Sequence, residues 1–357
     1  MDSSSLKLKA LGWSNWFEQR AECLPADSIA RVAAVDRDQL LLIDRNGHFR
    51  AKLTGRFLHR HDQSHELPCV GDWVCVKKQP KDDLGLIQSV IPRKTYLRRK
   101  AAGKSIEFQM IAANVDNVFI VQSCHYDFNV KRLERYLVMV WDGGAKPYIL
   151  LTKTDLVDPA VLDSQLTEIR SAGISAPIIS LSNVTQAGIS DLRQFLLPGT
   201  TSCFVGSSGV GKSTLINHLI GSELLETSSV SGTGEGTHTT VRRELIVMES
   251  GGLVIDNPGM RELGILGAED GMSESFAEID SLASNCRYRD CTHVREPGCA
   301  VIEAVKIGDI SQAHYEHYLK LQEESKFNQL SYVEKRKKDR DFGKFIKSAK
   351  KNLHHKS

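Results

Sequence analysis

The sequence has no apolar run long enough to cross a bilayer. Its longest uninterrupted apolar run is Tyr136–Trp141, whereas a membrane-spanning helix needs roughly 18 residues. The N-terminal stretch MDSSSLKLKALGWSNWFEQR also lacks the apolar core of roughly 7 to 15 residues that is typical of a secretory signal. We therefore expect a cytoplasmic protein with no membrane partner.

Cysteine is scarce, with eight residues in 357, which is too few for a disulfide scaffold. Five of them are scattered, mostly among apolar neighbours, and we expect them to be small buried hydrophobes. These five are Cys23, Cys69, Cys75, Cys124 and Cys203. The other three lie within fourteen positions of one another and surround a histidine. In a reducing cytosol such a cluster favours a metal site over disulfides.

A large net charge is also missing, because 46 Lys and Arg oppose 44 Asp and Glu to give +2. This balance hides an asymmetry. Residues 335–357 contain ten basic and two acidic residues, a charge of +8, which leaves −6 for residues 1–334. The basic tail is either a solvating segment or a contact for the phosphates of RNA. A second basic stretch, Arg93–Lys104, is either a solvated linker or a second RNA contact.

The overall composition, 41% hydrophobic and 25% charged, is that of a globular protein and excludes a fibrous or wholly disordered chain. The length predicts two or three domains. Residues 1–28 are polar with two tryptophans and no clear period, so we expect a flexible or loosely docked arm.

Five short β-like runs follow the arm, and the dipeptide Asn46-Gly47 predicts a hairpin between two of them. The runs are Ile29–Val35, Leu40–Ile43, Phe49–Leu53, Asp72–Lys77 and Leu86–Ile91. Their number and length favour a five-stranded OB-type barrel, and an SH3-like or other small barrel fits these residues about as well.

From Val115 to Gly259 the pattern changes to apolar strands that alternate with amphipathic helices, which predicts a parallel sheet covered on both faces. The predicted strands are Val118–Gln122, Tyr148–Thr152, Ile178–Ser180 and Ser202–Val205, and the predicted helices are Lys131–Trp141, Ala160–Ala172 and Ile189–Leu196. After Gly259 the pattern becomes helical, with a long polar helix expected at Gln312–Lys326.

The segment GSSGVGKS, Gly206–Ser213, follows one of these strands and fits the phosphate-binding pattern G-x-x-x-x-G-K-[ST]. Its glycines allow backbone N–H groups to point at phosphate oxygens, and its lysine reaches the β- and γ-phosphates. The serine hydroxyl is a ligand for Mg²⁺. The expected nucleotide contacts are Gly206, Ser207, Ser208, Gly209, Val210, Gly211, Lys212, Ser213 and Thr214.

TKTD, Thr152–Asp155, follows another apolar strand and is similar to the guanine-specificity motif N-K-x-D of GTPases. The Asp155 carboxylate accepts hydrogen bonds from N1–H and the exocyclic amine of guanine, whereas adenine offers neither donor. Lys153 covers the base with its stem, and Thr154 completes the motif. Thr152 replaces the usual asparagine and keeps a hydroxyl that can tie loops together.

DNPG, Asp256–Gly259, ends a third apolar strand and matches the D-x-x-G motif of P-loop GTPases. There Asp256 holds Mg²⁺ through water, and the Gly259 N–H senses the γ-phosphate. The preceding Gly- and Thr-rich stretch, Gly232–Thr240, is similar to a first switch loop whose Thr240 closes onto Mg²⁺, with Thr239 as the alternative.

The order of the motifs is unusual, because TKTD precedes the phosphate loop by about fifty residues. A doubly wound sheet can be opened at one surface loop and rejoined at its old termini without moving the site. The central domain is therefore predicted to be a circularly permuted GTPase domain.

Taken together, the barrel, the permuted motifs, the Cys/His cluster and the basic tail resemble the bacterial ribosome small-subunit-dependent GTPase A family across nearly the whole chain. The resemblance implies an OB-fold, a permuted GTPase domain and a C-terminal zinc domain. It also implies GTP hydrolysis to GDP and phosphate, stimulated by the small ribosomal subunit during late maturation of that subunit, with contact to its rRNA. We expect a monomer. The expected domains are 1–28 (arm), 29–104 (barrel and connector), 105–268 (GTPase), 269–334 (zinc-binding helices) and 335–357 (tail).

Catalysis needs a group that orients the attacking water, and Met260 stands where many GTPases have glutamine. A thioether cannot orient water. His238, in the stretch that resembles the family's G-x-H-T-T, is the candidate catalytic residue, and its alternative is a solvent-exposed loop histidine.

The Cys/His cluster consists of Cys286, Cys291, His293 and Cys299. Three thiolates and one imidazole are the ligand set of a closed tetrahedral Zn²⁺ site, so we expect one structural zinc ion. The alternative is buried cysteine without metal. Two other functions fit parts of the sequence: a non-enzymatic RNA-binding protein switched by nucleotide, and a P-loop ATPase or kinase.

Overall fold

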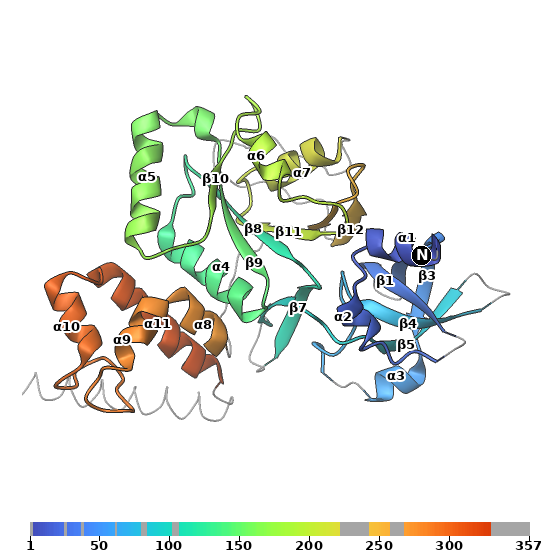
Figure 1. Cartoon of the computed structure of the whole chain (residues 1–357), viewed down its shortest axis with the longest axis horizontal. Coiled ribbons are helices and arrows are strands. Elements are labelled where there is room, and N and C mark those ends of the chain that lie inside the picture. Colours follow the sequence, from blue (N-terminus) through green and yellow to red (C-terminus); the bar gives the residue numbers. More distant parts are fainter. Residues whose placement is uncertain are drawn as a thin grey trace, which may run out of the picture.

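The computed structural model describes residues 3–24, 27–36, 39–60, 63–79, 84–101, 107–221, 243–257 and 268–329. Figure 1 shows three bodies: a barrel, a central α/β domain and a helical module on the side of that domain away from the barrel. No helix in these ranges is both long enough and apolar enough to cross a membrane. The predicted positions His238, Thr239, Thr240, Gly259 and Met260, and the basic tail, lie outside the described residues.

The N-terminal body is a closed five-stranded barrel, as the sequence predicted. Its strands are β1 (Ser28–Val35), β2 (Leu40–Asp44), β3 (Gly47–Leu53), β4 (Trp73–Lys78) and β5 (Leu84–Val90), with helix α3 (Gly55–Arg60) between β3 and β4. The pairing order β1-β2-β3-β5-β4 closes because β4 also pairs with β1, and only β3 and β5 run parallel. This closed arrangement confirms the OB-type prediction.

The predicted hairpin between β2 and β3 is present, but its turn begins one residue earlier than expected. Asp44 pairs with Gly47, so the two loop residues are Arg45 and Asn46. Gly47 opens β3 at φ +121°, a backbone conformation that glycine adopts without a steric cost. The Asp44 carboxylate accepts a hydrogen bond from the Asn46 N–H and fixes the turn.

The N-terminal arm is packed against the barrel, so the expectation of loose docking was wrong. Its helices are α1 (Ser3–Ala10) and α2 (Asn15–Glu18). The Trp13 ring meets the Trp73 ring edge-on, with centroids 4.9 Å apart, and Phe17 is buried beside both. A disulfide joins Cys23 to Cys75 of β4, which corrects the expectation that both are unpaired hydrophobes. The remaining three scattered cysteines are free and buried, as expected.

The central domain contains the predicted doubly wound sheet. Its strands are β8 (Asn117–Ser123), β9 (Lys146–Thr152), β10 (Ile178–Ser180), β11 (Thr201–Gly206), β12 (Glu244–Val247) and β13 (Leu253–Asp256). They lie in the order β10-β9-β8-β11-β13-β12, and only β12 is antiparallel to its neighbour. The helices are α4 (Val130–Asp142), α5 (Pro159–Ser171), α6 (Ile189–Arg193) and α7 (Lys212–Ile220), with a 3₁₀ turn η1 at Thr154–Leu156.

Alternate residues of each central strand face opposite layers of helices. On β8, Val118 and Ile120 belong to the apolar cluster that includes residues of α4 and α5, while Phe119 and Val121 belong to the cluster that includes α6 and α7. Burial on both faces explains why these strands are continuously apolar in sequence. The helices on both faces therefore fix the positions of the strand ends at the carboxyl edge of the sheet.

The basic stretch after the barrel is part of the fold. It enters the hairpin of β6 (Tyr96–Lys100) and β7 (Phe108–Ala113). Arg93 forms a bidentate ion pair with the buried carboxylate of Asp72, with both distances 2.8 Å, and Arg98 pairs with Asp142 at the end of α4. These two cations join parts of the protein to each other, so the interpretation as a solvated linker was wrong for them.

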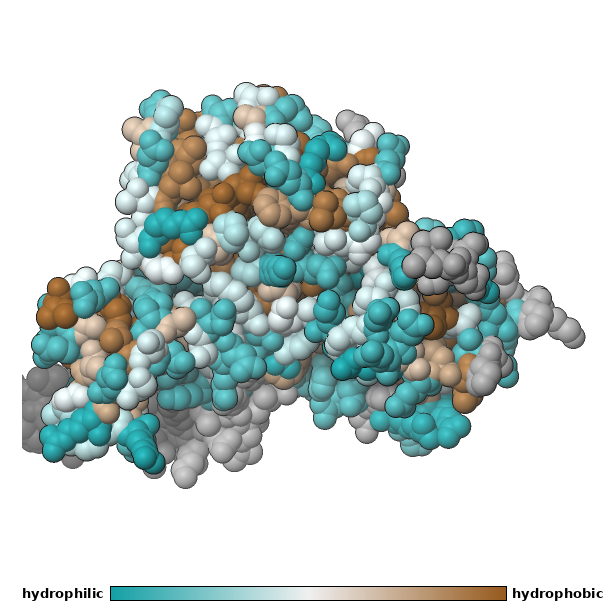
Figure 2. Space-filling model, in the orientation of Figure 1, coloured by the Kyte–Doolittle hydropathy of each residue, from teal (hydrophilic) through white to brown (hydrophobic). Residues whose placement is uncertain are grey.

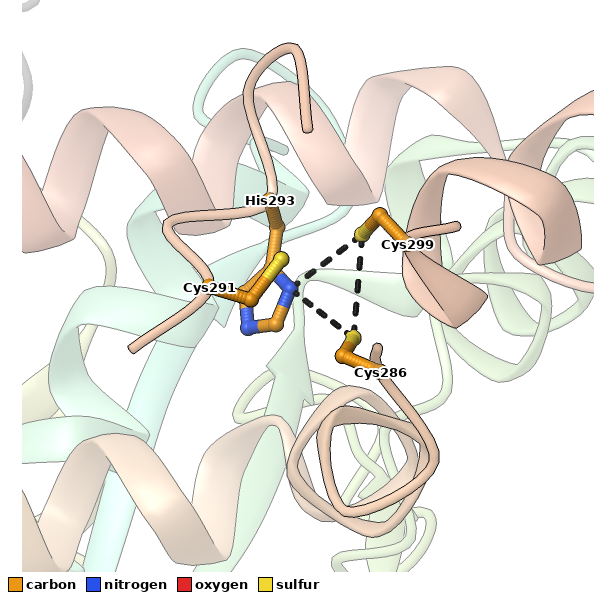
Figure 3. A group of neighbouring side chains, drawn as sticks. All are labelled: Cys286, Cys291, His293 and Cys299. Atoms are coloured by element: carbon orange, nitrogen blue, oxygen red, sulfur yellow. Dashed lines mark hydrogen bonds between the residues drawn. The ribbon is translucent and has the colours of Figure 1, made fainter. Parts of the chain in front are cut away.

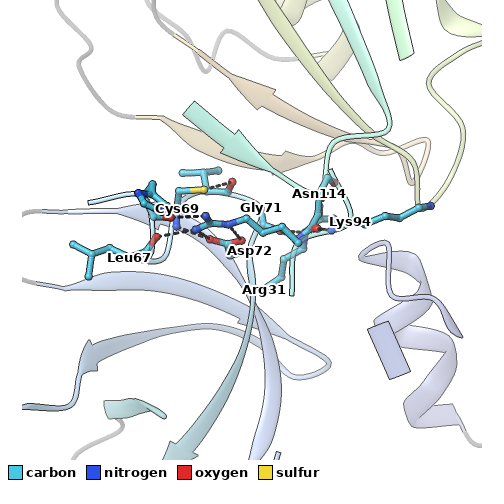
Figure 4. Close-up of polar contacts among 10 residues, drawn as sticks. Arg31, Leu67, Cys69, Gly71, Asp72, Lys94 and Asn114 are labelled. Carbon is cyan, nitrogen blue, oxygen red and sulfur yellow. Dashed lines mark hydrogen bonds and ion pairs between the residues drawn. The ribbon is translucent and has the colours of Figure 1, made fainter. Parts of the chain in front are cut away.

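Arg31 on β1 forms a second link between the barrel and the central domain. Its guanidinium is almost fully buried and donates hydrogen bonds to four partners, namely the Leu11, Gly71 and Asn114 carbonyls and the Thr201 hydroxyl. Figure 4 shows this junction, with Arg31, Gly71 and Asn114 meeting between the two bodies. A buried cation with four acceptors fixes the orientation of the barrel.

The C-terminal body is helical, as predicted. It contains α8 (Glu269–Ser275), α9 (Ala277–Ala283), α10 (Ala300–Ile307) and α11 (Gln312–Gln329). It docks on α4 of the central domain through a buried ionic cluster, in which His314 bonds Glu134 at 2.6 Å and Glu278, and His317 also contacts Glu134. Burial opposes protonation of His314, but the hydrogen bonds to the two carboxylates outweigh it and raise the pKa of His314 to about 9.

The surface in the view of Figure 2 is largely hydrophilic over the helical module. Apolar side chains gather most plainly on the central domain, in the region of α5, α6 and α7. Residues with an exposed apolar side chain in that domain include Leu156, Val161, Val184 and Leu197.

Candidate functional site

The three nucleotide motifs meet at the carboxyl edge of the central sheet. TKTD begins at the last residue of β9, the phosphate loop begins at the last residue of β11, and DNPG begins at the last residue of β13. Because these strands are parallel, their carboxyl ends lie at the same edge, where α/β proteins bind ligands. The fold therefore brings together segments that are about fifty residues apart in sequence.

Two glycines of the phosphate loop stand where a side chain would not fit. A Cβ on Gly206, which has φ +150°, would lie 2.3 Å from the Val121 carbonyl oxygen. A Cβ on Gly211, with φ +94°, would lie 2.9 Å from the Asn183 amide nitrogen. At Gly206 the loop therefore passes the β8 backbone too closely for a side chain, whereas at Gly211 it is the positive φ that favours glycine. Helix α7 begins at Lys212, within the motif. An anion at this helix N-terminus would meet exposed N–H groups.

Lys212 is positioned inside the phosphate loop. Its ammonium donates hydrogen bonds to the Gly206 carbonyl at 2.9 Å and to the Ser207 carbonyl, and its side chain is buried. Burial lowers the pKa of Lys212 to about 8, while Asp256 and Asp127 act in the opposite direction. A phosphate placed in the loop would supply the negative charge that this buried cation lacks.

The guanine motif is tied to the phosphate loop by the residue that departs from the common pattern. Thr152 is fully buried, and its hydroxyl lies 2.7 Å from the Val210 carbonyl in the phosphate loop. The hydroxyl of Thr152 thus links the TKTD segment to the phosphate loop, although the usual asparagine is missing. Lys153 adopts the left-handed conformation at φ +59°, and the turn η1 carries Asp155.

The loop after β10 completes this part of the site, and sequence reasoning missed it. The Ser182 hydroxyl donates to the Asp155 carboxylate, and the N–H groups of Val184 and Thr185 lie 3.1 Å from the same hydroxyl. The Asn183 side chain donates to the Gly211 carbonyl at 3.0 Å. Polar residues directly after a predicted strand were the available signal, because the carboxyl ends of parallel strands share one edge.

Two oxygen ligands suited to Mg²⁺ occur on this edge. Asp256 pairs with Phe204 in the β11–β13 ladder, two residues before the phosphate loop, and Ser213 is the second residue of α7. Burial raises the pKa of Asp256, and the neighbouring Lys212 opposes this shift. A carboxylate and a hydroxyl are hard oxygen donors, the type that Mg²⁺ prefers beside a nucleotide. These residues therefore fit the ion.

Asp127 is a further acidic residue at this edge that sequence reasoning did not select. It lies in the loop between β8 and α4, and one of its carboxylate oxygens pairs with Arg132 at 2.6 Å. The other oxygen is buried and has no hydrogen-bond partner among the described residues. Its negative charge acts on Lys212.

The four residues of the Cys/His cluster lie together at the helical module (Figure 3). All four ligand atoms lie within 4.8 Å of one another. The Cys286 and Cys299 sulfurs are 3.8 Å apart, and the His293 Nδ1 lies 3.6 Å from the first and 3.4 Å from the second. Tetrahedral zinc with Zn–S about 2.3 Å and Zn–N about 2.1 Å requires ligand separations of about 3.8 Å and about 3.6 Å. The cluster could therefore hold a metal ion such as zinc.

Comparison with known proteins agrees with these motifs. The model of a family described as RsgA GTPase matches residues 90–266. A relative from Lactiplantibacillus plantarum, "Small ribosomal subunit biogenesis GTPase RsgA 2", is 40% identical over 331 residues, covering 91% of this chain and 92% of the relative. The chain belongs to the RsgA GTPase family. It is therefore an enzyme that hydrolyses GTP.

Another RsgA relative and two solved structures are also similar to this chain. "Small ribosomal subunit biogenesis GTPase RsgA" of Opitutus terrae is 39% identical, with 90% of each chain covered. The crystal structure of YjeQ from Thermotoga maritima superposes with a TM-score of 0.62 at 27% identity, covering 83% of this chain and 97% of YjeQ. YloQ, described as a circularly permuted GTPase, gives a TM-score of 0.61 at 25% identity, covering 88% of this chain and all of YloQ. The permuted order predicted for this chain is thus that of a known fold.

Proposed function

We propose that the chain binds the small ribosomal subunit, assists its late maturation, and hydrolyses GTP to GDP and phosphate with ribosome stimulation. The names of the relatives from L. plantarum and O. terrae support the choice of subunit and process. The observation that carries the nucleotide part is the joint anchoring of three loops by Thr152 and Asn183. Loops held in this way can bind the base and the phosphates of one GTP with little ordering cost.

In this proposal each motif has one task. Asp155, oriented by Ser182, reads guanine, and the backbone of the phosphate loop together with Lys212 holds the phosphates. Ser213, Asp256 and Thr240 bind Mg²⁺, which would neutralise charge on the β- and γ-phosphates. The Gly259 N–H senses the γ-phosphate, and the Cys/His cluster holds one structural Zn²⁺.

Contact with rRNA is assigned to the barrel, the helical module and the basic tail. Arg287, Arg289 and Arg295 are exposed around the Cys/His cluster, where they can meet phosphates. In the basic stretch after the barrel, Arg93 and Arg98 already pair with carboxylates, so that stretch offers fewer charges to RNA than its composition suggests.

Sedimentation tests the proposed partner. We expect the chain to pellet with small subunits in the presence of a non-hydrolysable GTP analogue, less so with GDP, and not with large subunits. Small subunits should also accelerate phosphate release. Equal binding to both subunits would contradict the proposed partner, and binding without any phosphate release would favour the nucleotide-switched RNA-binding protein.

His238 is the proposed catalytic residue, because Met260 cannot orient the attacking water. We expect His238→Ala to keep its affinity for a GTP analogue and to lose about a hundredfold of the subunit-stimulated turnover, the scale of a missing water-orienting or acid–base group. Phosphate release with and without small subunits measures this. His218→Ala, an exposed histidine of α7, is the matched control. Unchanged stimulated turnover in His238→Ala would exclude this role.

A further inference from the structure

Arg243 and Asn257 lie one residue beyond the last pair of the β12–β13 ladder and are joined by their side chains. In the antiparallel β12–β13 ladder Glu244 pairs with Asp256, so the next pair in register is Arg243 with Asn257. The Arg243 Nε donates to the Asn257 side-chain oxygen at 2.9 Å, and Asn257 is fully buried. Asn257 directly follows Asp256, the proposed Mg²⁺ carboxylate.

The same guanidinium also reaches the β6–β7 hairpin between the barrel and the central domain. Its Nη1 donates to the Met110 carbonyl on β7 at 3.2 Å. The neighbouring residue Glu244 pairs on its other side with Ala34 of β1, in the barrel. Arg243 therefore lies directly before β12, the strand that pairs with β13 and with β1 of the barrel, and its side chain contacts β7. Its planar guanidinium presents donors in fixed directions, which suits two acceptors on different strands.

We propose that Arg243 is a positioning residue for GTP hydrolysis, which fixes Asp256 through Asn257. Groups that hydrogen-bond a metal-binding carboxylate contribute about tenfold to a hundredfold in metal affinity. The Asp256 carboxylate accepts such a bond from the Asn257 backbone N–H, and Arg243 holds the Asn257 side chain. The inference rests on the proposed role of Asp256 toward Mg²⁺.

The decisive experiment is a Mg²⁺ titration of the binding of a fluorescent GTP analogue to the full chain, with steady-state turnover measured alongside. For Arg243→Met we expect the Mg²⁺ concentration at half-maximal binding to rise about tenfold, and kcat to fall more than KM changes. Arg243→Lys keeps the charge and one donor, and should recover part of both effects.

A double-mutant cycle separates positioning from general loosening of the fold. If Arg243 acts through Asn257, the double variant Arg243→Met/Asn257→Ala should be no worse than the worse single variant. Arg50→Met, which removes an arginine from barrel strand β3 of the same continuous sheet, is the matched control and should leave the titration unchanged. Thermal melts check that each variant folds. If Arg243→Met does not fold, Asn257→Ala takes its place in the titration.

Asp256→Asn in the same titration separates the proposed role of Asp256 toward Mg²⁺ from the proposed role of Arg243. If Asp256→Asn leaves the Mg²⁺ requirement unchanged, the proposed role of Asp256 fails. If Asp256→Asn raises it while Arg243→Met has no effect, or if the Arg243 and Asn257 effects simply add, only the inference on Arg243 is overturned.

Discussion

Replacing Asp155 with asparagine should weaken GTP binding about a hundredfold. In the proposed function the carboxylate accepts hydrogen bonds from two donors of guanine, and Ser182 already orients one of its oxygens. Asparagine would place an amide donor against one of these guanine donors. The lost charge-assisted bond and the unpaired group together cost about 3 kcal/mol, which corresponds to a hundredfold change.

The same substitution should create an affinity for xanthosine triphosphate. Xanthine has a carbonyl where guanine has its exocyclic amine, so the new amide donor meets an acceptor. Competition of GTP, xanthosine triphosphate and ATP against a fluorescent GTP analogue measures both effects. Ser182→Ala, which leaves the carboxylate but removes its orienting hydroxyl, should weaken GTP binding by a smaller factor. Unchanged GTP affinity in Asp155→Asn would exclude Asp155 as the guanine-reading group.

Loss of the metal should unfold the helical module while the rest of the chain stays folded. The core of this module includes Phe276, Ile279 and Val301 and contains few large apolar side chains, with Cys286, Cys291 and Cys299 packed against or within it. Structural zinc supplies about 10–16 kcal/mol to small metal-dependent modules. We therefore expect Cys286→Ser, or treatment with a strong chelator, to remove the metal and expose the module to protease.

Metal analysis and limited proteolysis measure these effects. The full chain should contain about one zinc ion per molecule, the number that one four-ligand site holds. In Cys286→Ser, cleavage should fall within residues 268–329. Cys124→Ser, a buried free cysteine of the central domain, is the matched control and should keep the zinc. A metal-free chain whose module resists protease would show that the cysteines are only buried hydrophobes.

The unfolded module would also lose its contacts with α4 of the central domain. Glu134 and Arg135 of α4 hold α11 through His314 and Glu324, and α4 begins next to the loop that carries Asp127. Unfolding of the module would take His314 and His317 away from Glu134 and expose this carboxylate on α4 to water. GTP turnover of Cys286→Ser in the absence of ribosomes therefore reports how far this helix couples the module to the phosphate edge.

Most elements of the fold could be predicted because their signals are local. The continuous apolar run of β8 reflects burial on both faces of the sheet, and the strand was predicted correctly from it. The packed N-terminal arm was not predicted, because Trp13 finds its partner Trp73 sixty residues later. The Cys23–Cys75 disulfide and the hydrogen bond from Arg31 to Thr201 also join residues that are far apart in the sequence.

The sequence by itself determined which motifs are present: a phosphate loop, a TKTD segment whose carboxylate is proposed to read guanine, their permuted order, and a Cys/His cluster that could hold a metal ion. The phosphate loop, the TKTD segment and the Cys/His cluster are short motifs that can be recognised from their own residues, and the glycines of the phosphate loop adopt positive φ angles. Only the tertiary structure decided how they are held together, through Thr152 on Val210, Ser182 on Asp155 and Arg243 on Asn257. These contacts join different strands and loops, so they exist only once the order of the strands in the sheet is set.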